Sequence, residues 1–129
     1  MYAVNVMIVD DDKITLAMLE HIIEELTSGE ILVFSSSIKA HDFLLSQDAQ
    51  RINLVICDWQ MPGISGIKIL ETLRIKKPDC PFFMITAIPT SELVISAKRL
   101  GVTNFIAKPF VTVNLINALS KLLEEITPD

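Results

Sequence analysis

Short runs of consecutive apolar residues alternate along this chain with longer stretches of mixed polarity. Uninterrupted apolar runs are typical of strands that are buried on both faces of a sheet. The runs predict five strands, at residues 4–9, 31–34, 53–58, 82–86 and 104–107. This pattern favours a covered, parallel sheet over a half-exposed antiparallel one.

The mixed stretches carry apolar residues at the spacing of one helix face. The first predicted helix spans about residues 13–26 and follows Asp12, whose carboxylate suits an N-cap. The second is expected at about residues 38–47, after three serines that can cap it. A third precedes Lys77-Pro78, a fourth lies between Thr90 and Gly101, and a fifth spans residues 113–126.

The regular alternation of strands and helices indicates the fold class. It predicts an α/β fold whose right-handed crossovers place helices on both faces of a doubly wound, five-stranded parallel sheet. The length of 129 residues suits one domain. We expect residues 1–129 to form that single domain, with residues 127–129 as a tail or the start of a linker.

Composition narrows the classes of partner. The net charge of −5 and the absence of a dense basic stripe argue against direct binding of nucleic acid. No apolar run approaches the length of a membrane span, and the start of the chain lacks the pattern of a signal peptide, so we expect a cytoplasmic protein without membrane contact. Cys57 and Cys80 have no metal-ligand spacing and are expected to be unpaired.

Polar residues end or directly follow four of the predicted strands. They are the triplet Asp10-Asp11-Asp12, then Asp58, Thr86 and Lys108. The carboxyl ends of parallel strands open on one edge of the sheet, so these side chains are expected to converge there. Grouped carboxylates need a counter-charge, and Mg²⁺ combines carboxylate, water and phosphate oxygens. The sequence therefore predicts a site for a divalent cation and a phosphoryl group.

Some of these residues also have a plainer explanation, which does not account for Asp10 and Asp11. Asp12 is accounted for as a helix cap, and Thr86 or Lys108 alone would be an ordinary strand-end residue. Only the combination favours a functional site. Trp59, directly after Asp58, is expected to be partly exposed beside that site.

Four segments together resemble the receiver domain of bacterial two-component response regulators, in order and spacing. They are Met7-Ile8-Val9-Asp10-Asp11-Asp12, Leu54-Val55-Ile56-Cys57-Asp58-Trp59-Gln60-Met61-Pro62-Gly63, Phe82-Phe83-Met84-Ile85-Thr86-Ala87 and Phe105-Ile106-Ala107-Lys108-Pro109-Phe110. The resemblance covers essentially the whole chain. It implies a flavodoxin-like (βα)5 receiver fold with strand order 2-1-3-4-5.

The resemblance also implies roles for the acidic residues. Asp58 matches the aspartate that accepts a phosphoryl group. Asp11, Asp58 and the main-chain carbonyl of Gln60 match the ligands of Mg²⁺, the implied cofactor, and Asp10 matches the carboxylate that acts through water. The implied function is that of a phosphoacceptor signalling module, not an enzyme acting on an external substrate.

Further residues match the family's switch. Lys108 matches the lysine that pairs with phosphoryl oxygens, and its bond to Pro109 is expected to be cis. Thr86 matches the hydroxyl that bonds the phosphoryl group, and Phe105 matches the aromatic residue that turns inward with it. The implied output surface comprises the fourth helix, fifth strand and fifth helix. The implied partners are a histidine kinase or phosphotransfer protein, docking near the first helix, and a downstream protein target or effector domain.

The chain departs from the family's usual pattern in two places. Ile64-Ser65-Gly66 stands where many receivers have Met-Asp-Gly, which we interpret as a loop change that leaves the chemistry intact. Gln60 and Ile88 occupy positions that tune phosphoryl lifetime in the family. Because Ile88 is apolar, we hypothesise that it restricts the attacking water and gives a long-lived phosphoryl state.

Two other functions are compatible with part of the pattern. A small phosphatase of the haloacid-dehalogenase type would use Asp10 as nucleophile, but Ile14 departs from that family's first motif and the segment from Asp58 to Pro62 would have no role. A receiver-like binding module that is never phosphorylated is the other alternative. Such proteins usually lack the acceptor or an acidic ligand, and this chain has both.

Overall fold

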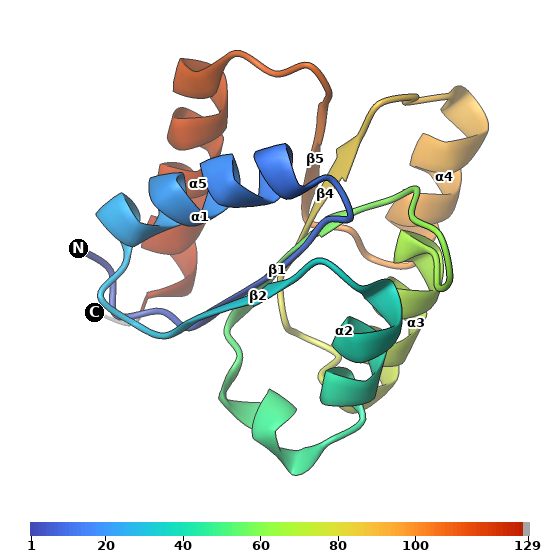
Figure 1. The fold of residues 1–129 in the computed structure, drawn as a ribbon, viewed down its shortest axis with the longest axis horizontal. Helices are drawn as coiled ribbons and strands as arrows, with labels where there is room; N and C mark the ends of the chain where they lie inside the picture. Colours follow the sequence, from blue (N-terminus) through green and yellow to red (C-terminus); the bar gives the residue numbers. More distant parts are fainter. Residues whose placement is uncertain (128–129) are drawn as a thin grey trace.

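The computed structural model describes residues 1–127 and contains a parallel sheet whose strands alternate with helices (Figure 1). The strands are β1 (Val6–Val9), β2 (Ile31–Phe34), β3 (Leu54–Asp58), β4 (Phe82–Thr86) and β5 (Asn104–Ala107). Their order in the sheet is β2-β1-β3-β4-β5, and every pairing is parallel. The predicted fold class and strand order are therefore confirmed.

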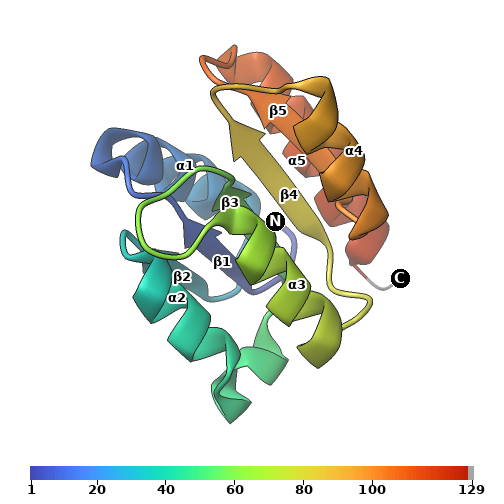
Figure 2. The same cartoon turned by 90° about the vertical axis from the view of Figure 1, so that its right-hand side faces the viewer.

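Helices cover both faces of this sheet. They are α1 (Lys13–Leu26), α2 (Ser37–Leu44), α3 (Gly66–Lys76), α4 (Ser91–Arg99) and α5 (Thr112–Ile126), with a short 3₁₀ helix, η1 (Gln47–Arg51), after α2. Helices α1 and α5 lie on one face, and α2, α3 and α4 lie on the other (Figures 1 and 2). No helix in the described range is long and apolar enough to cross a membrane.

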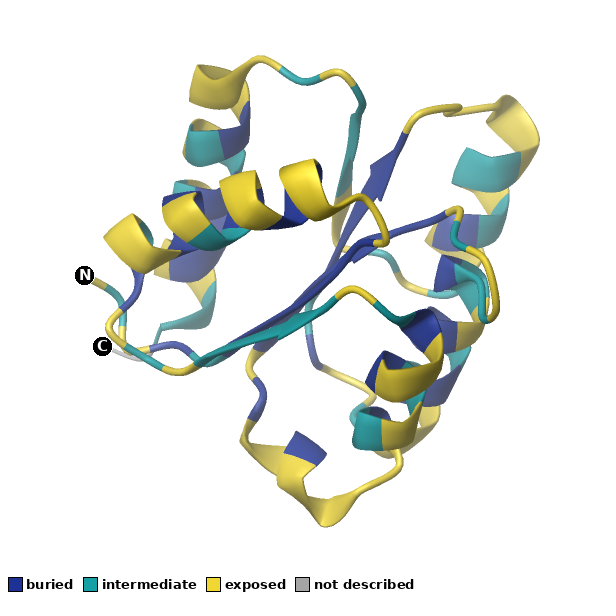
Figure 3. Cartoon of the chain, in the orientation of Figure 1, coloured by how far each residue is buried: buried dark blue, intermediate teal, exposed yellow. Residues whose placement is uncertain are grey.

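Alternate residues of the central strands pack into two apolar clusters, one on each face. Met7, Val55 and Met84 point toward α2, α3 and α4, whereas Ile8 and Ile56 point toward α1 and α5. All residues of β1, β3 and β4 are buried, as the dark strands in Figure 3 show. Burial on both faces explains why these strands are uninterrupted apolar runs in the sequence.

Two predicted boundaries were wrong by more than one residue. Strand β1 begins at Val6 rather than at residue 4. The backbone amide and carbonyl of Val4 bond to the Thr27 hydroxyl instead of a neighbouring strand. Helix α2 ends at Leu44 rather than at residue 47, and the chain continues into η1. There Arg51 forms an ion pair with Glu30, which favours the separate turn.

Several local predictions are confirmed. The Asp12 side chain caps α1 by accepting a hydrogen bond from the Ile14 amide. The Lys108–Pro109 peptide bond is cis, and both cysteines are free and buried. Of the predicted tail, residues 128 and 129 lie outside the described range.

Candidate functional site

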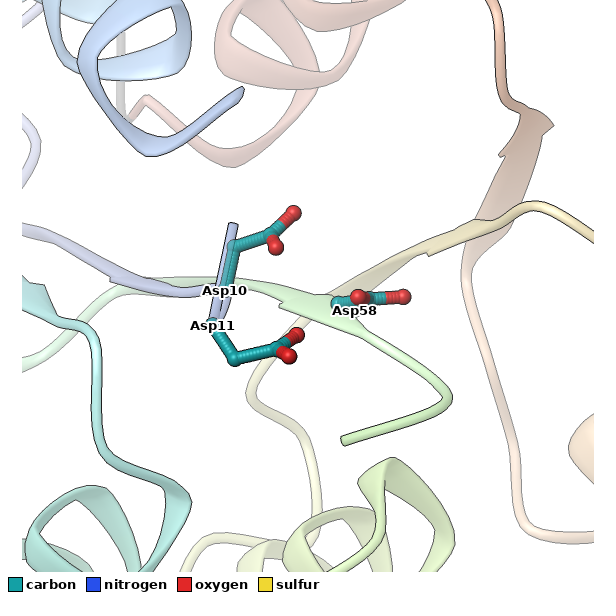
Figure 4. A group of neighbouring side chains, drawn as sticks. All are labelled: Asp10, Asp11 and Asp58. Atoms are coloured by element: carbon teal, nitrogen blue, oxygen red, sulfur yellow. The ribbon is translucent and has the colours of Figure 1, made fainter. Parts of the chain in front are cut away.

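Three aspartates meet at the carboxyl edge of the sheet (Figure 4). Asp58 is the last residue of β3, and Asp10 and Asp11 directly follow β1. The Asp10 amide still bonds to the Phe34 carbonyl of β2, at 3.1 Å, so Asp10 keeps the direction of its strand. One carboxylate oxygen from each aspartate lies within 4.8 Å of the other two. The predicted convergence of these side chains is confirmed.

Lys108 brings a positive charge to the same edge from the end of β5. Its Nζ lies 2.8 Å from Oδ2 of Asp10 and 3.4 Å from Oδ2 of Asp58. Asp10 is fully buried, and its other oxygen, Oδ1, accepts a hydrogen bond from the Asp12 amide at 2.9 Å. Both oxygens of Asp10 are therefore engaged, whereas Asp11 is exposed.

The electrostatics of the cluster favour an added cation. Burial, followed by the charge of Asp10, raises the pKa of Asp58 to about 6, and Lys108 and the Gln60 amide oppose this rise only in part. Burial acts to lower the pKa of Lys108, but the two carboxylates outweigh burial and hold that pKa above its ordinary value. One ammonium group thus faces several carboxylates, and negative charge remains in excess.

The donor set fits a hard divalent cation. All three candidate side-chain ligands offer carboxylate oxygens, and within the described residues this group of carboxylates includes no histidine or cysteine. Such a donor set suits Mg²⁺, whereas zinc sites are typically built from cysteine sulfur and histidine nitrogen. Gln60 follows Asp58 by two residues, and its backbone amide donates a hydrogen bond to Oδ1 of Asp58 at 3.4 Å.

The two predicted switch residues lie on neighbouring strands. Thr86 ends β4 and is fully buried, and its hydroxyl oxygen accepts a hydrogen bond from the Ile88 amide at 3.2 Å. Thr86 pairs with Ala107, and Phe105 lies two residues before Ala107 in β5. Because side chains alternate along a strand, Thr86 and Phe105 face the same side of the sheet, the side covered by α4.

The prediction that Trp59 is partly exposed was wrong, since only 7% of the residue is accessible. Its amide donates to the Ile85 carbonyl at 2.9 Å and so extends the ladder of β3 by one residue. Its side chain consequently joins Cys57 in the apolar cluster beneath α2, α3 and α4. The period-two alternation after Cys57 was the signal that could have revealed this burial.

Sequence reasoning also missed the residue that holds the loop after β3. Ser37, at the start of α2, is buried, and its hydroxyl bonds to the backbone on both sides of Gly63. The sequence indicated only that a serine in this region would cap a helix. No spacing relates Ser37 to a loop so far along the chain.

Comparison with known proteins identifies the family to which this chain belongs. Residues 6–120 match the family model described as response regulator receiver domain. Chemotaxis protein CheY-3 of Vibrio cholerae is 29% identical over 124 residues, which cover 95% of this chain and 93% of that protein. The CheY homolog of Campylobacter jejuni is 27% identical, with 92% of each chain covered.

A solved structure shares the fold at low sequence identity. The CheY-like receiver domain protein of Methanospirillum hungatei superimposes with a TM-score of 0.84 at 22% identity, covering 95% of both chains. The family match spans nearly all of the chain and includes the strand ends that carry the acidic cluster and Lys108. This protein therefore belongs to the response regulator receiver domain family, whose members act as phosphoacceptors in two-component signalling.

Proposed function

We propose that Asp58 is the phosphoacceptor and that it receives its phosphoryl group from a phosphohistidine of a kinase or phosphotransfer protein. The observation that carries the proposal is the meeting of three carboxylates and Lys108 at the carboxyl edge of the sheet. In the reaction an oxygen of Asp58 forms a bond to phosphorus as the bond from phosphorus to the donor's histidine nitrogen breaks.

The hydrogen-bond partners of the two carboxylates support Asp58 over Asp10 as the nucleophile. Both oxygens of Asp10 are occupied, by Lys108 and by the Asp12 amide. Asp58 has weaker partners, at 3.4 Å on each oxygen, and retains some exposure. The same difference disfavours a phosphatase that would use Asp10.

Asp11, Asp58 and the main-chain carbonyl of Gln60 would hold Mg²⁺, with Asp10 acting through water. The bound ion supplies positive charge that offsets the negative charge of the phosphoryl group. Lys108 supplies a second positive charge, and its contacts to Asp10 and Asp58 keep its ammonium group at the site. Phosphoryl transfer depends mainly on such positioning and charge, so no further catalytic group is required.

We propose that Thr86 and Phe105 transmit the change to the surface. A phosphoryl group on Asp58 adds acceptor oxygens beside Lys108, and the Thr86 hydroxyl would leave the Ile88 amide to bond one of them. Phe105 is half-buried on the same side of the sheet and can respond by packing further inward. Two packings of this edge then provide the switch.

The partners follow from the surfaces next to these residues. Ile14 and Met18 are exposed apolar side chains on α1, beside the site, and suit the helical domain that carries the donor histidine. The output surface is formed by α4, β5 and α5 and would be recognised by a protein target or effector domain. It is centred on Ile95, Lys98, Phe105 and Lys121. In this proposal residues 1–129 act as one cytoplasmic receiver domain.

The test is intact-protein mass spectrometry after incubation with acetyl phosphate and MgCl₂. We expect a single phosphoryl adduct that is absent from Asp58→Asn and from a sample with EDTA. An adduct that survives Asp58→Asn would contradict the assignment. Release of phosphate that survives Asp58→Asn but not Asp10→Asn would favour the phosphatase, and no adduct from either acetyl phosphate or a phosphorylated histidine protein would favour an unphosphorylated binding module.

A further inference from the structure

The loop from Trp59 to Ser65 carries the carbonyl of Gln60 between two fixed ends. Its base is closed because the Gly66 amide donates to the Trp59 carbonyl at 2.9 Å. The approach is so close that a Cβ on Gly66 would lie 2.6 Å from the Asp58 carbonyl oxygen. The base of the loop is thereby tied to the end of β3, but this contact leaves its tip unsupported.

Ser37 holds the tip from a different part of the chain. Its hydroxyl donates to the Pro62 carbonyl at 2.7 Å and accepts from the Ile64 amide at 2.9 Å. Between these two peptide groups Gly63 turns the backbone with a φ of +86°. Within residues 1–127, these are the hydrogen bonds that join residues 61–64 to any other residue.

Because Ser37 is buried, its hydrogen bonds to the loop are hard to replace. Only 3% of the residue is exposed, so water has little access to replace a missing hydroxyl. Without that hydroxyl, a carbonyl and an amide at the tip would lose their partner, and the loop would shift to restore hydrogen bonds. Met61 and Ile64 pack partly against the apolar cluster, but apolar contacts do not fix the orientation of a peptide group.

The position of the Gln60 carbonyl depends on this tip. A main-chain ligand has no rotatable side chain, so its oxygen can be placed only by the path of the backbone. Gln60 lies between the tied base at Trp59 and the tied tip at Pro62. Groups that orient a metal ligand without touching the metal commonly affect its affinity strongly.

We propose that Ser37 is a positioning residue of the metal site, which holds the loop so that the Gln60 carbonyl is preorganised for Mg²⁺. The inference rests on the proposed function, because it takes the Gln60 carbonyl as a ligand. Ser37 itself is not one of the proposed ligands of the ion. It links α2, on the side of β2, to the ligand loop that follows β3.

The test is the Mg²⁺ dissociation constant of the full chain, measured with MgCl₂ through the fluorescence of Trp59, its one tryptophan. Ser37→Ala is expected to raise this constant about tenfold. The matched control is Ser36→Ala, which removes the hydroxyl that caps α2 through the Lys39 amide but that forms no hydrogen bond to the loop. The control is expected to lose stability in urea yet keep the wild-type dissociation constant.

Each outcome decides the question. An unchanged constant in Ser37→Ala, or an equal rise in both variants, overturns the positioning role while leaving the proposed function intact. Absence of Mg²⁺ binding by the wild-type protein overturns the proposed metal site and this inference with it. If Ser37→Ala does not fold, Gly63→Ala replaces it, since its added Cβ would lie 3.1 Å from the Ser37 hydroxyl. An unchanged constant in that variant also overturns the proposal.

Discussion

The centre of the sheet and its β5 edge are packed very differently. Every residue of β1, β3 and β4 is buried, whereas β5 is only half-buried and begins with an exposed residue. Helix α4, beside that edge, has a single buried residue, Ala97. The acidic residues follow the densely packed strands, and the proposed output surface lies on the loosely packed edge.

This difference separates two tasks that need opposite properties. Ligand groups must stay fixed, and full burial of their supporting strands restricts their movement. A switching surface must have two packings of similar free energy, which requires few buried contacts. Lys108 joins the two regions, because it leaves β5 and bonds to carboxylates that follow β1 and end β3.

The largest expected effect compares matching isoleucines in the two regions. Ile56 in β3 is fully buried, whereas Ile106 in β5 is only partly buried in the same apolar cluster. We expect Ile56→Ala to lower the free energy of unfolding by about 3–4 kcal/mol and Ile106→Ala by about 1–2 kcal/mol. Urea denaturation measures both values, and equal losses would contradict the contrast in packing.

A smaller effect is expected where α4 is tied to α3. Arg74 donates to the carbonyls of Leu100, Gly101 and Cys80 at 3.0, 2.6 and 2.7 Å. Arg74→Met should cost about 2 kcal/mol, because it leaves the partly buried carbonyls unpaired, and should speed amide exchange near the end of α4. The control Arg51→Met removes an exposed ion pair and should cost less than about 1 kcal/mol.

Without bound metal, ionisation of the acidic cluster is expected to lower the free energy of unfolding, by an amount that depends on pH. The pKa of Asp58 is raised from 3.8 to about 6, so the native state holds this proton more tightly than the unfolded chain does. The stability that comes from this tighter proton binding is fully present below pH 4 and is lost as pH rises toward 6 and above.

In EDTA at pH 7, Asp58→Asn should therefore be more stable than the wild type by about 1 kcal/mol, a value reduced for solvent screening. The gain should shrink toward zero at pH 4, where Asp58 is mostly protonated in the native state. Thermal unfolding of both proteins at the two pH values measures the difference. A gain of the same size at pH 4 would rule out ionisation of Asp58 as its cause.

The smallest effect concerns the loop after β4, at the loosely packed edge. Ile88 is 54% exposed and its amide bonds to the Thr86 hydroxyl. If its apolar side chain restricts water near the phosphoryl group, Ile88→Glu should shorten the half-life of the adduct about threefold. Ile95→Glu, at a similarly exposed position on α4, is the control. Mass spectrometry over time follows both, and an unchanged half-life in Ile88→Glu contradicts the hypothesis.

The sheet was predictable because burial on both faces leaves uninterrupted apolar runs, as in β3 and β4. Convergence of Asp10, Asp58 and Lys108 was predictable for a related reason, since parallel strands bring their carboxyl ends to one edge. These features depend on local pattern and on topology alone. Neither needs the detailed packing of particular side chains.

Features that depend on contacts between distant segments were missed. Helix α2 is followed by a turn in which Arg51 pairs with Glu30, and the Thr27 hydroxyl bonds to the backbone of Val4 just before β1. The role of Ser37 depends on a loop that follows β3, although α2 itself was predicted. A hydroxyl that bonds to distant backbone groups leaves no period in the sequence.

The bond between Lys108 and Asp10 spans 98 residues of chain. A contact of such long separation closes a large loop, and the entropic cost of closing it is offset by the docking of the intervening strands. During synthesis Asp10 and Asp58 emerge well before Lys108, so a nascent chain holds the acidic groups without the ammonium that completes the cluster. The complete set of charges at the site therefore forms only after Lys108 has been synthesised and the sheet has folded.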